Sequence, residues 1–364
     1  MKPWELDPAR YEALWRAKCR ETERGFEQFD APAAAYFASP ATAYRLRAEF
    51  RLWHEGDDLN YVMFDPDRPK EPIPVVSFQQ ALQPIQDAMP RLLDAVKSNP
   101  MLRRKLFQVE FMAARSGSVL VTLAYHRPLD EQWEYEARLI ASEMDLSIIG
   151  RSRKQKRVIG CDWIEESFTV GSNAHHYRSY EQSFVQPNVY VNESMLNWVY
   201  RNAANAHGDL LELYCGNGNF TLPLAAKYGR ILATEVAKSS TKAALENLRM
   251  NNVNNVDLVR LSAEEVVQAL SGVREFQRLK GLSQPLDKFE FSAVFVDPPR
   301  SGLDEETCKL VQRFDRIYYV SCNPETLRAN LQQLTKTHRL QALAFFDQFP
   351  YTNHIESAVV LERA

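Results

Sequence analysis

The sequence predicts a two-domain α/β protein: a doubly wound, Rossmann-like parallel sheet in the C-terminal half, preceded by a smaller, β-rich α+β domain. Two observations predict this. From about residue 190 onward, short apolar strands alternate with helical segments, whereas residues 44–125 contain pairs of strands separated by turn sequences. A length of 364 residues is typical of two domains. The predicted division is 1–180 and 181–364.

The N-terminal elements follow from residue spacing. A polar helix is predicted within residues 8–28, followed by a strand over 44–53, a turn at 55–58 and a returning strand over 59–64. Residues 78–97 show helical spacing, interrupted by Pro84 and Pro90, and a second hairpin joins 106–113 to 119–125. The predicted core positions of the first strand and of the helix are Leu46, Ala48, Phe50, Leu52, Leu82, Ile85, Met89, Leu92 and Val96.

The C-terminal elements begin with a helix over about 190–205. Strands are then predicted at 209–214, 230–234, 257–261, 291–296, 316–321, 339–345 and 356–362. The carboxyl ends of parallel strands meet at one edge of a sheet, and ligands bind in the crevice outside that edge. We therefore expect the functional residues to follow these strands.

The composition excludes several classes of protein. Apolar residues make up 45% and charged residues 25%, with a net charge of −3, which argues against a non-specific nucleic-acid binder but not against local basic patches. The start lacks a signal-peptide pattern and no apolar run is long enough for a membrane helix, so we expect a cytoplasmic protein without membrane contact. The five cysteines lack metal-site spacing, so neither a metal nor an iron–sulfur cluster is expected.

A glycine-containing loop follows the strand at 209–214. Gly216 and Gly218 allow the backbone to approach a ligand, but Thr221 occupies the position of the third glycine of a dinucleotide-binding loop. Glu235 ends the next strand, where a carboxylate can accept hydrogen bonds from a ribose diol. These residues resemble the class I S-adenosylmethionine-dependent methyltransferase fold. Asn219 either contacts the S-adenosylmethionine or serves as a helix N-cap.

Two further strand ends carry reactive groups. Asp297 begins a loop stiffened by Pro298 and Pro299, and Cys322 follows the strand at 316–321. A thiolate that adds to carbon 6 of uracil makes carbon 5 nucleophilic enough to accept a methyl group, and a base must then remove the carbon 5 proton. We expect the site to lower the pKa of Cys322. Glu356, before the last strand, is the candidate base.

These blocks resemble the RNA 5-methyluridine methyltransferase family, most closely its tRNA branch, over essentially the whole chain. The resemblance rests on residues 44–54, 105–108, 184–188, 211–220, 297–303, 321–327 and 346–356. It implies S-adenosyl-L-methionine as methyl donor, Cys322 as nucleophile and Glu356 as proton acceptor. It implies donor contacts from Gln186, Tyr214, Gly216, Asn219, Glu235 and Asp297.

The resemblance also implies an RNA substrate. The expected target is uridine 54 in the T-loop of tRNA, with the tRNA-like domain of transfer-messenger RNA as a second substrate and the protein acting as a monomer. The N-terminal domain is then the RNA-binding domain. The RNA contacts expected there are Arg47, Arg51, Phe107, Lys154 and Lys156.

Other functions remain open at this stage. A 5-methylcytosine methyltransferase would carry a second cysteine after the Asp-Pro pair, and an amino-group methyltransferase an aromatic residue where Arg300 stands. An rRNA 5-methyluridine methyltransferase would often carry an additional barrel domain and a cysteine cluster. An RNA-binding or RNA-remodelling protein would need no thiol at Cys322.

Overall fold

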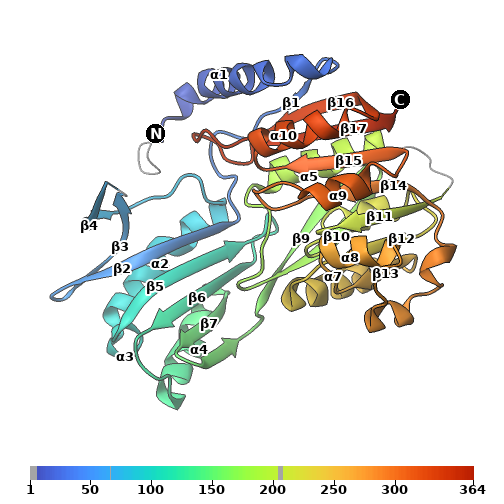
Figure 1. Ribbon diagram of the computed structural model, residues 1–364. Coiled ribbons are helices and arrows are strands. Elements are labelled where there is room, and N and C mark those ends of the chain that lie inside the picture. The colour runs from blue at the N-terminus through green and yellow to red at the C-terminus, as the bar shows by residue number, and fades with distance from the viewer. Residues whose placement is uncertain (1–5, 66, 204–207) are drawn as a thin grey trace.

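The computed structural model describes residues 6–65, 67–203 and 208–364 and contains two large sheets joined by a hairpin (Figure 1). In the larger sheet the strand order is β1-β16-β17-β15-β14-β11-β12-β13. Its strands are β1 (Ala35–Phe37), β11 (Asp209–Leu213), β12 (Ile231–Thr234), β13 (Val256–Val259), β14 (Phe291–Val296), β15 (Arg316–Ser321), β16 (His338–Phe346) and β17 (Glu356–Arg363).

The predicted C-terminal strands are confirmed, with one difference in direction. Neighbouring strands from β13 to β15 are parallel, as predicted, but β17 is antiparallel to both β15 and β16. A parallel connection needs a crossover, whereas β17 returns directly from β16 through the loop 347–355. The reversal matters for the site, since the first residue of β17 lies at the edge where β15 ends.

Helices cover both faces of this sheet. One face packs against α5 (Val189–Asn202), α6 (Thr221–Leu224) and α7 (Lys238–Met250). The other packs against α1 (Tyr11–Arg24), α8 (Ala263–Leu270), α9 (Glu305–Val311) and α10 (Pro324–Leu334). Successive strand residues point to opposite faces, so Leu210 belongs to the first core and Leu211 to the second.

The N-terminal segment packs on the C-terminal sheet, although the sequence predicts it in the N-terminal domain. Tyr11, Trp15 and Cys19 form one buried stripe of α1, spaced four residues apart as in a helix. β1 then pairs in parallel with β16. The backbone pairing of β1 and the apolar stripe of α1 both lie against this sheet, so α1 and β1 pack with the larger domain, and the smaller sheet begins at β2.

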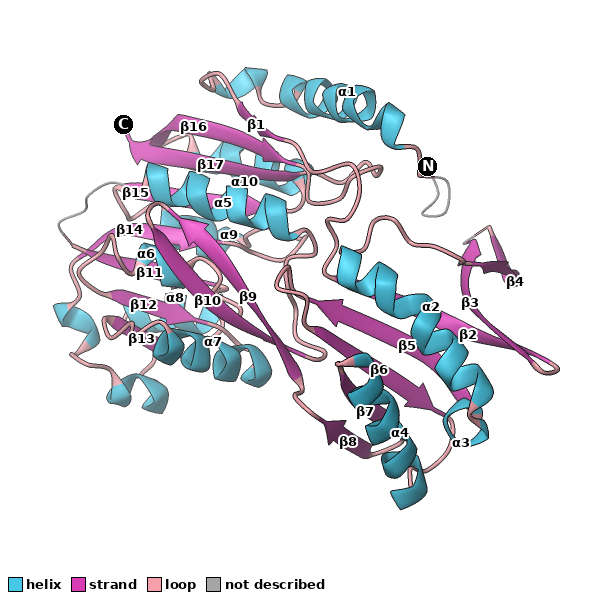
Figure 2. Ribbon diagram, turned by 180° about the vertical axis from the view of Figure 1, so that it is seen from behind, coloured by secondary structure: helices cyan, strands magenta, loops and turns pink. Residues whose placement is uncertain are grey.

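The smaller domain is a seven-stranded sheet covered on one face by helices. Its strand order is β4-β3-β2-β5-β6-β7-β8, and α2 and α4 lie across one face (Figure 2). The strands are β2 (Arg47–Glu55), β3 (Asp58–Asp65), β4 (Arg68–Pro74), β5 (Leu106–Ala113), β6 (Val119–Tyr125), β7 (Ser147–Ser152) and β8 (Gln155–Ile159), and the helices are α2 (Gln83–Ser98), α3 (Pro100–Arg103) and α4 (Glu131–Met144).

The predicted hairpins and helix of this domain are confirmed, and their predicted core residues are all buried. Pro84 does not interrupt α2, because it lies in the first helical turn, where a missing N–H costs nothing. Pro90 lies inside α2, which continues past it. The face of the sheet opposite the helices carries polar and aromatic side chains, among them Arg51 and Phe107.

A two-stranded hairpin, β9 (Trp163–Val170) and β10 (Asn173–Tyr180), joins the domains. It is fastened to α7 by backbone N–H groups of His176 and Arg178, which donate to Asn251 and Asn247 at 2.9 and 2.8 Å. Four short 3₁₀ segments complete the described structure: Pro8–Arg10, Glu27–Phe29, Gln277–Gly281 and Leu286–Lys288.

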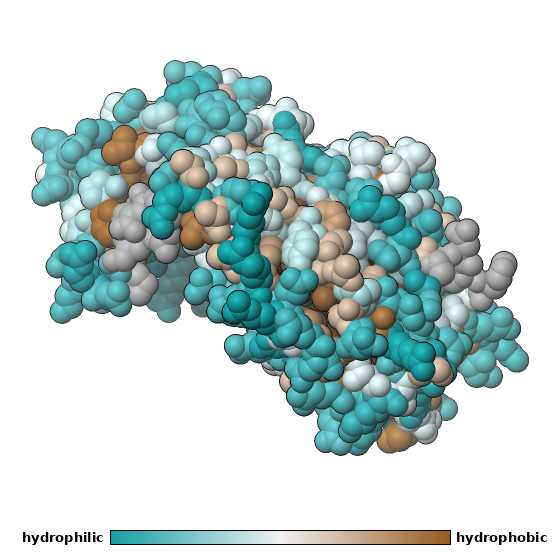
Figure 3. Space-filling view, turned by 90° about the horizontal axis from the view of Figure 1, so that it is seen from above, coloured by the Kyte–Doolittle hydropathy of each residue, from teal (hydrophilic) through white to brown (hydrophobic). Residues whose placement is uncertain are grey.

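The face of the molecule seen from above is mostly hydrophilic, with small, separate hydrophobic patches (Figure 3). Within the described residues, no helix is both long and apolar enough to cross a membrane.

Candidate active site

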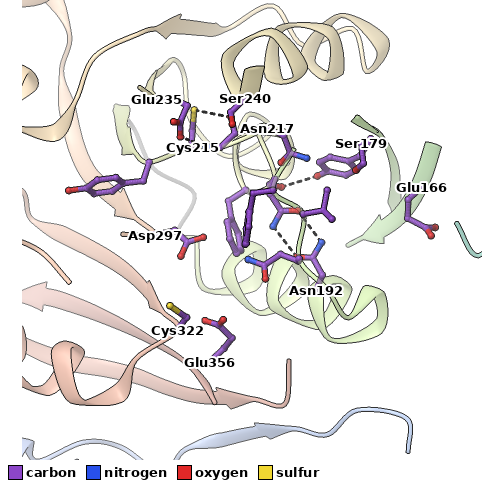
Figure 4. Close-up of a pocket in the computed structure, with 18 of the residues that line it drawn as sticks. Glu166, Ser179, Asn192, Cys215, Asn217, Glu235, Ser240, Asp297, Cys322 and Glu356 are labelled. Carbon is purple, nitrogen blue, oxygen red and sulfur yellow. Dashed lines mark hydrogen bonds between the residues drawn. The ribbon is translucent and has the colours of Figure 1, made fainter. Parts of the chain in front are cut away.

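A cavity of about 520 Å³ lies outside the carboxyl ends of β11, β12, β14 and β15. This is the edge at which ligands bind in doubly wound sheets. The predicted donor-site and catalytic residues all line it, namely Gln186, Tyr214, Gly216, Asn219, Glu235, Asp297, Cys322 and Glu356. Figure 4 shows Cys322 and Glu356 side by side, with Asp297 between them and Glu235.

The glycine loop is held open by its backbone conformation. Tyr214, Gly216 and Gly218 all have positive φ, at 61°, 57° and 84°. At Gly218 a Cβ would make an ordinary van der Waals contact with the Cβ of Ala244, at 3.6 Å, so the positive φ rather than the space is what favours glycine there. The loop therefore curves around the cavity instead of filling it.

Glu235 is fixed by the backbone around it. Its carboxylate accepts hydrogen bonds from the backbone N–H of Gly216 at 3.1 Å and of Ala237 at 2.8 Å. These two bonds orient the side chain at the end of β12, beside the glycine loop. Glu235 is thus placed to accept hydrogen bonds from a diol in the cavity.

Asn219 is not a helix N-cap. α6 begins after Phe220 and has no side-chain cap. The side chain of Asn219 instead exchanges two hydrogen bonds with the side chain of Asn192 of α5, at 3.0 and 2.9 Å. The backbone carbonyl of Asn219 accepts a hydrogen bond from the Tyr177 hydroxyl of β10 at 2.9 Å. Asn192 and Tyr177 also line the cavity, and no sequence motif indicates them.

The cavity is rich in carboxyl groups. Of the described residues that line it, Arg300 alone is basic, whereas Glu166, Glu235, Asp297 and Glu356 are acidic. Burial raises the pKa of Asp297 to about 7. Burial, together with the charge of Asp297, raises the pKa of Glu356 to about 8.

Glu212 adds a further buried carboxyl behind the glycine loop. Its side chain is fully buried, and neither carboxylate oxygen has a hydrogen-bond partner within the described part of the chain. Burial is the main reason that its pKa rises to about 8. A positive charge near buried carboxyl groups favours their ionised form. The carboxyl groups in and behind the cavity therefore favour a cationic ligand.

Cys322 lies in the turn between β15 and α10, half-buried. Asn323, the next residue, caps α10 by accepting from the N–H of Glu325 at 3.1 Å. Its side chain also donates to the carbonyl of Arg300 at 3.2 Å. The turn that carries Cys322 is therefore tied to the loop that carries Asp297.

The expectation that the site lowers the pKa of Cys322 is wrong for this structure. The pKa is raised to about 11, first because the thiol is partly buried and then because Glu356 and Asp297 are nearby. Arg300 acts in the opposite direction but does not outweigh them. The sequence could not reveal this, because Glu356 and Asp297 approach the thiol only in the folded sheet.

The predicted RNA-contact residues lie outside the cavity, in the smaller domain. Phe107 is half-buried and stacks on His126, with ring centroids 3.8 Å apart and planes 8° apart. The guanidinium of Arg51 lies 5.5 Å from the centroid of Phe107. Arg51 and His126 are exposed, so the group forms an accessible aromatic and cationic surface. His126 has no sequence signal of its own.

The basic residues of this domain differ in their partners. Arg47 pairs with Glu110 at 3.0 Å, and Lys156 pairs with Asp162 at 2.7 Å. Lys154 is exposed and, within the described residues, has no carboxylate within 4.0 Å. Of these three cations, Lys154 is therefore the one left free for an external anion.

The chain matches the family model described as tRNA (Uracil-5-)-methyltransferase over residues 10–364. A protein of Ectopseudomonas mendocina is 52% identical over 358 residues, covering 98% of each chain, and one of Stutzerimonas stutzeri is 50% identical over 359 residues, covering 99% of each. Both are named tRNA/tmRNA (uracil-C(5))-methyltransferase.

A solved structure has the same fold. The Pyrococcus abyssi tRNA (uracil-54, C5)-methyltransferase, in complex with S-adenosyl-L-homocysteine, superposes with a TM-score of 0.73 at 19% identity. The match covers 96% of this chain and 83% of that one. The predicted methyltransferase fold of the C-terminal half is thereby confirmed.

Proposed function

This chain belongs to the tRNA (uracil-5-)-methyltransferase family, and from that premise we propose that it methylates carbon 5 of uridine 54 in the T-loop of tRNA. The tRNA-like domain of transfer-messenger RNA is the second proposed substrate. The observation that carries the proposal is the meeting of Cys322, Glu356 and Asp297 in one cavity. A tRNA substrate implies a protein that works in the cytoplasm, and we expect it to act as a monomer.

The cavity fits S-adenosyl-L-methionine as donor. This molecule supplies an electrophilic methyl group on a sulfonium and carries an ammonium group, so it is cationic where the cavity is acidic. Glu235 is oriented for the ribose diol, and Asp297 lies near the buried carboxyl of Glu212. Gln186, Tyr214 and Asn219 complete the set of residues that would hold the donor.

Cys322 begins the reaction by attacking the base. Its thiolate forms a bond to carbon 6 of uracil, and the ring electrons move to make an enolate with carbon 5 as the nucleophile. Carbon 5 then takes the methyl group as its bond to the sulfonium breaks, which leaves the donor as the neutral thioether S-adenosylhomocysteine. Glu356 accepts the proton that carbon 5 still carries, the carbon 5–carbon 6 double bond forms again, and the thiolate leaves. Cys322 and Glu356 are both unchanged after the cycle except for the proton on Glu356, which passes to solvent.

The raised pKa of Cys322 places a condition on the first step. The thiol must lose its proton before it adds, and burial together with the nearby carboxyls opposes this. A cationic donor bound beside Asp297 would offset their negative charge and favour the thiolate. The turn also places Cys322 just before the N-terminus of α10, whose dipole favours an anion. We therefore expect addition to be fastest after the donor has bound.

The aromatic and cationic surface of the smaller domain supports an RNA substrate. The Phe107–His126 stack offers a flat face to an unpaired base, and Arg51 and Lys154 offer charge to phosphates. A base in a duplex or a stacked loop cannot present carbon 6 to Cys322, so the target uridine must leave its stack.

The test is a direct one. Unmodified tRNA and transfer-messenger RNA transcripts are incubated with the protein and the labelled donor, and the methylated nucleotide is located by mass spectrometry after nuclease digestion. The expected product is 5-methyluridine at position 54. A transcript with cytidine at position 54 serves as the control and should gain no methyl group. A methyl group found elsewhere, or none at all, would overturn the proposal.

A further inference from the structure

Cys322 and Arg300 line not one cavity but two. The second has a volume of about 550 Å³ and lies between α1, the turn that starts α10 and the loop 351–355. Its volume falls within the range of roughly 300–1,000 Å³ that is usual for ligand sites. Of the described residues, Cys322 and Arg300 alone are common to both cavities, so the thiol stands where the two meet.

The walls of the second cavity are fixed by buried contacts. Lys18 of α1 donates to the Asp347 carboxylate at 2.5 Å and to the carbonyl of His354 at 2.9 Å. Tyr11 of α1 donates to the other Asp347 oxygen at 2.8 Å. These bonds hold α1 against the loop that leads to Glu356. The space between them is therefore a formed cavity and not a gap beside a loose terminus.

The chemistry of the lining suits a nucleotide. Arg300 and Arg328 both line the cavity, and no carboxylate of the described residues lies within 4.0 Å of either guanidinium. Guanidinium groups without acidic partners are suited to phosphate, which they bind through two parallel hydrogen bonds. Glu21 and Glu325, both exposed, also border the cavity and can accept hydrogen bonds from the amino group of a base.

The position of the cavity, beside Cys322 and opposite the donor site, suits the RNA that flanks the target uridine. A uridine attacked by Cys322 has to turn carbon 5 toward the donor, which occupies the first cavity. Where its ribose and phosphates continue away from the donor, the second cavity, which shares Cys322 with the first, is a formed space that can receive them. We propose that this cavity is an RNA subsite for a nucleotide next to the target uridine, with its phosphate at Arg300 and Arg328. The inference rests on the proposed function.

A matched pair of α1 variants tests the subsite. Ala17 is exposed and borders the cavity, whereas Ala13, one turn earlier and also exposed, does not. Ala17→Trp should fill the cavity and raise the KM for T-arm RNA by roughly tenfold, equivalent to about 1.4 kcal/mol. The dissociation constant for S-adenosylhomocysteine, measured by calorimetry, should not change. Ala13→Trp should match the wild type in both measurements.

Short oligonucleotide substrates show which neighbour of the target uridine, 5′ or 3′, occupies the second cavity. Two oligonucleotides carry the target uridine, one lacking its 5′ neighbour and one its 3′ neighbour. The effect of Ala17→Trp should disappear on the one that lacks the nucleotide held in the cavity. Equal RNA affinity and KM for Ala17→Trp, Ala13→Trp and wild type would overturn the subsite. If the wild type does not methylate RNA, the proposed function fails. The subsite is then tested by RNA binding alone, which should be weaker in Ala17→Trp than in Ala13→Trp.

Discussion

Cys322 and Glu356 are brought together by the pairing of Ser321 with Ser357 across the antiparallel strands β15 and β17. Cys322 directly follows the first of these serines and Glu356 directly precedes the second. In an antiparallel pair, the residue after one partner lies beside the residue before the other. The sheet itself therefore sets the thiol next to the carboxyl, at the edge where Asp297 also ends a strand.

Cys322→Ala should abolish methylation, lowering turnover by roughly 10⁴-fold or more, because the covalent step is lost. Binding of S-adenosylhomocysteine, measured by calorimetry, should stay near the wild-type value. Cys161→Ala is the control, since Cys161 is exposed in the smaller domain and should be dispensable. Turnover above a trace in Cys322→Ala would exclude the covalent mechanism.

Glu356→Gln should trap the reaction after methyl transfer. Addition and methylation do not need the carboxylate, but removal of the carbon 5 proton does, so a protein–RNA adduct should accumulate. Denaturing electrophoresis with labelled RNA would detect it. The double variant Cys322→Ala, Glu356→Gln should show no adduct. Normal turnover in Glu356→Gln without an adduct would assign the base to another residue.

The kcat/KM for RNA should rise between pH 6 and pH 9. The pKa of Glu356 is raised to about 8, so its basic form is the minor one at pH 7 and increases as the pH passes 8. The pKa of Cys322, raised to about 11, acts in the same direction, because the thiolate also increases with pH. Initial rates measured with donor binding checked at each pH would test this. A flat or falling profile would contradict it.

Phe107→Ala should weaken binding to folded tRNA by about 1–3 kcal/mol, the usual contribution of one base–aromatic stack. The loss should be smaller on an unstructured oligonucleotide that carries the same uridine. Tyr135→Ala provides the control, because Tyr135 is an exposed aromatic residue on α4, across the sheet from Phe107. Equal losses on both RNAs, or a drop in melting temperature alone, would make Phe107 a packing residue.

Charge reversal should distinguish two lysines of the segment 151–157. Lys154→Glu should weaken tRNA binding and reduce its salt dependence by about one unit of slope, because Lys154 has no acidic partner among the described residues. Lys156→Glu should act mainly on stability, because it sets a third carboxylate beside Asp162 and Glu181. Lys336→Glu, in the other domain, controls for net charge. If the salt dependence of tRNA binding is unchanged in Lys154→Glu, Lys154 does not contact an RNA phosphate.

Much of the fold follows from the sequence because its signals are local. The buried strands of the C-terminal half are short apolar runs, and the stripe on α2 shows helical spacing, so both are found without tertiary information. The resemblance to RNA 5-methyluridine methyltransferases is likewise confirmed by the family match. The eight residues predicted from it lie in one cavity, while their roles stay predictions.

The features that the sequence does not reveal depend on contacts between distant residues. The direction of β17 depends on its partner strands, and the packing of α1 on Asp347, more than 300 residues away. The hairpin β9–β10 was not predicted. Its Arg178 pairs both with Glu165 of the same hairpin and with Glu246 of α7. The pKa of Cys322 is raised, whereas the sequence predicted that it would be lowered, because Glu356 and Asp297 come near the thiol only in the folded chain.

The pairing of β1 with β16 has a consequence for synthesis of the chain. Ala35 of β1 lies opposite Ala344 of β16. The first strand to be synthesised therefore cannot pair until the second-last strand has been made. At translation rates of about 5–20 residues per second, the delay is roughly 15–60 s. During that time the apolar stripe of α1 lacks β16 and β17, whereas the seven strands of the smaller sheet pair only with one another and are all made by residue 159. The N-terminal segment is thus the first part of the protein to leave the ribosome and among the last to reach its place.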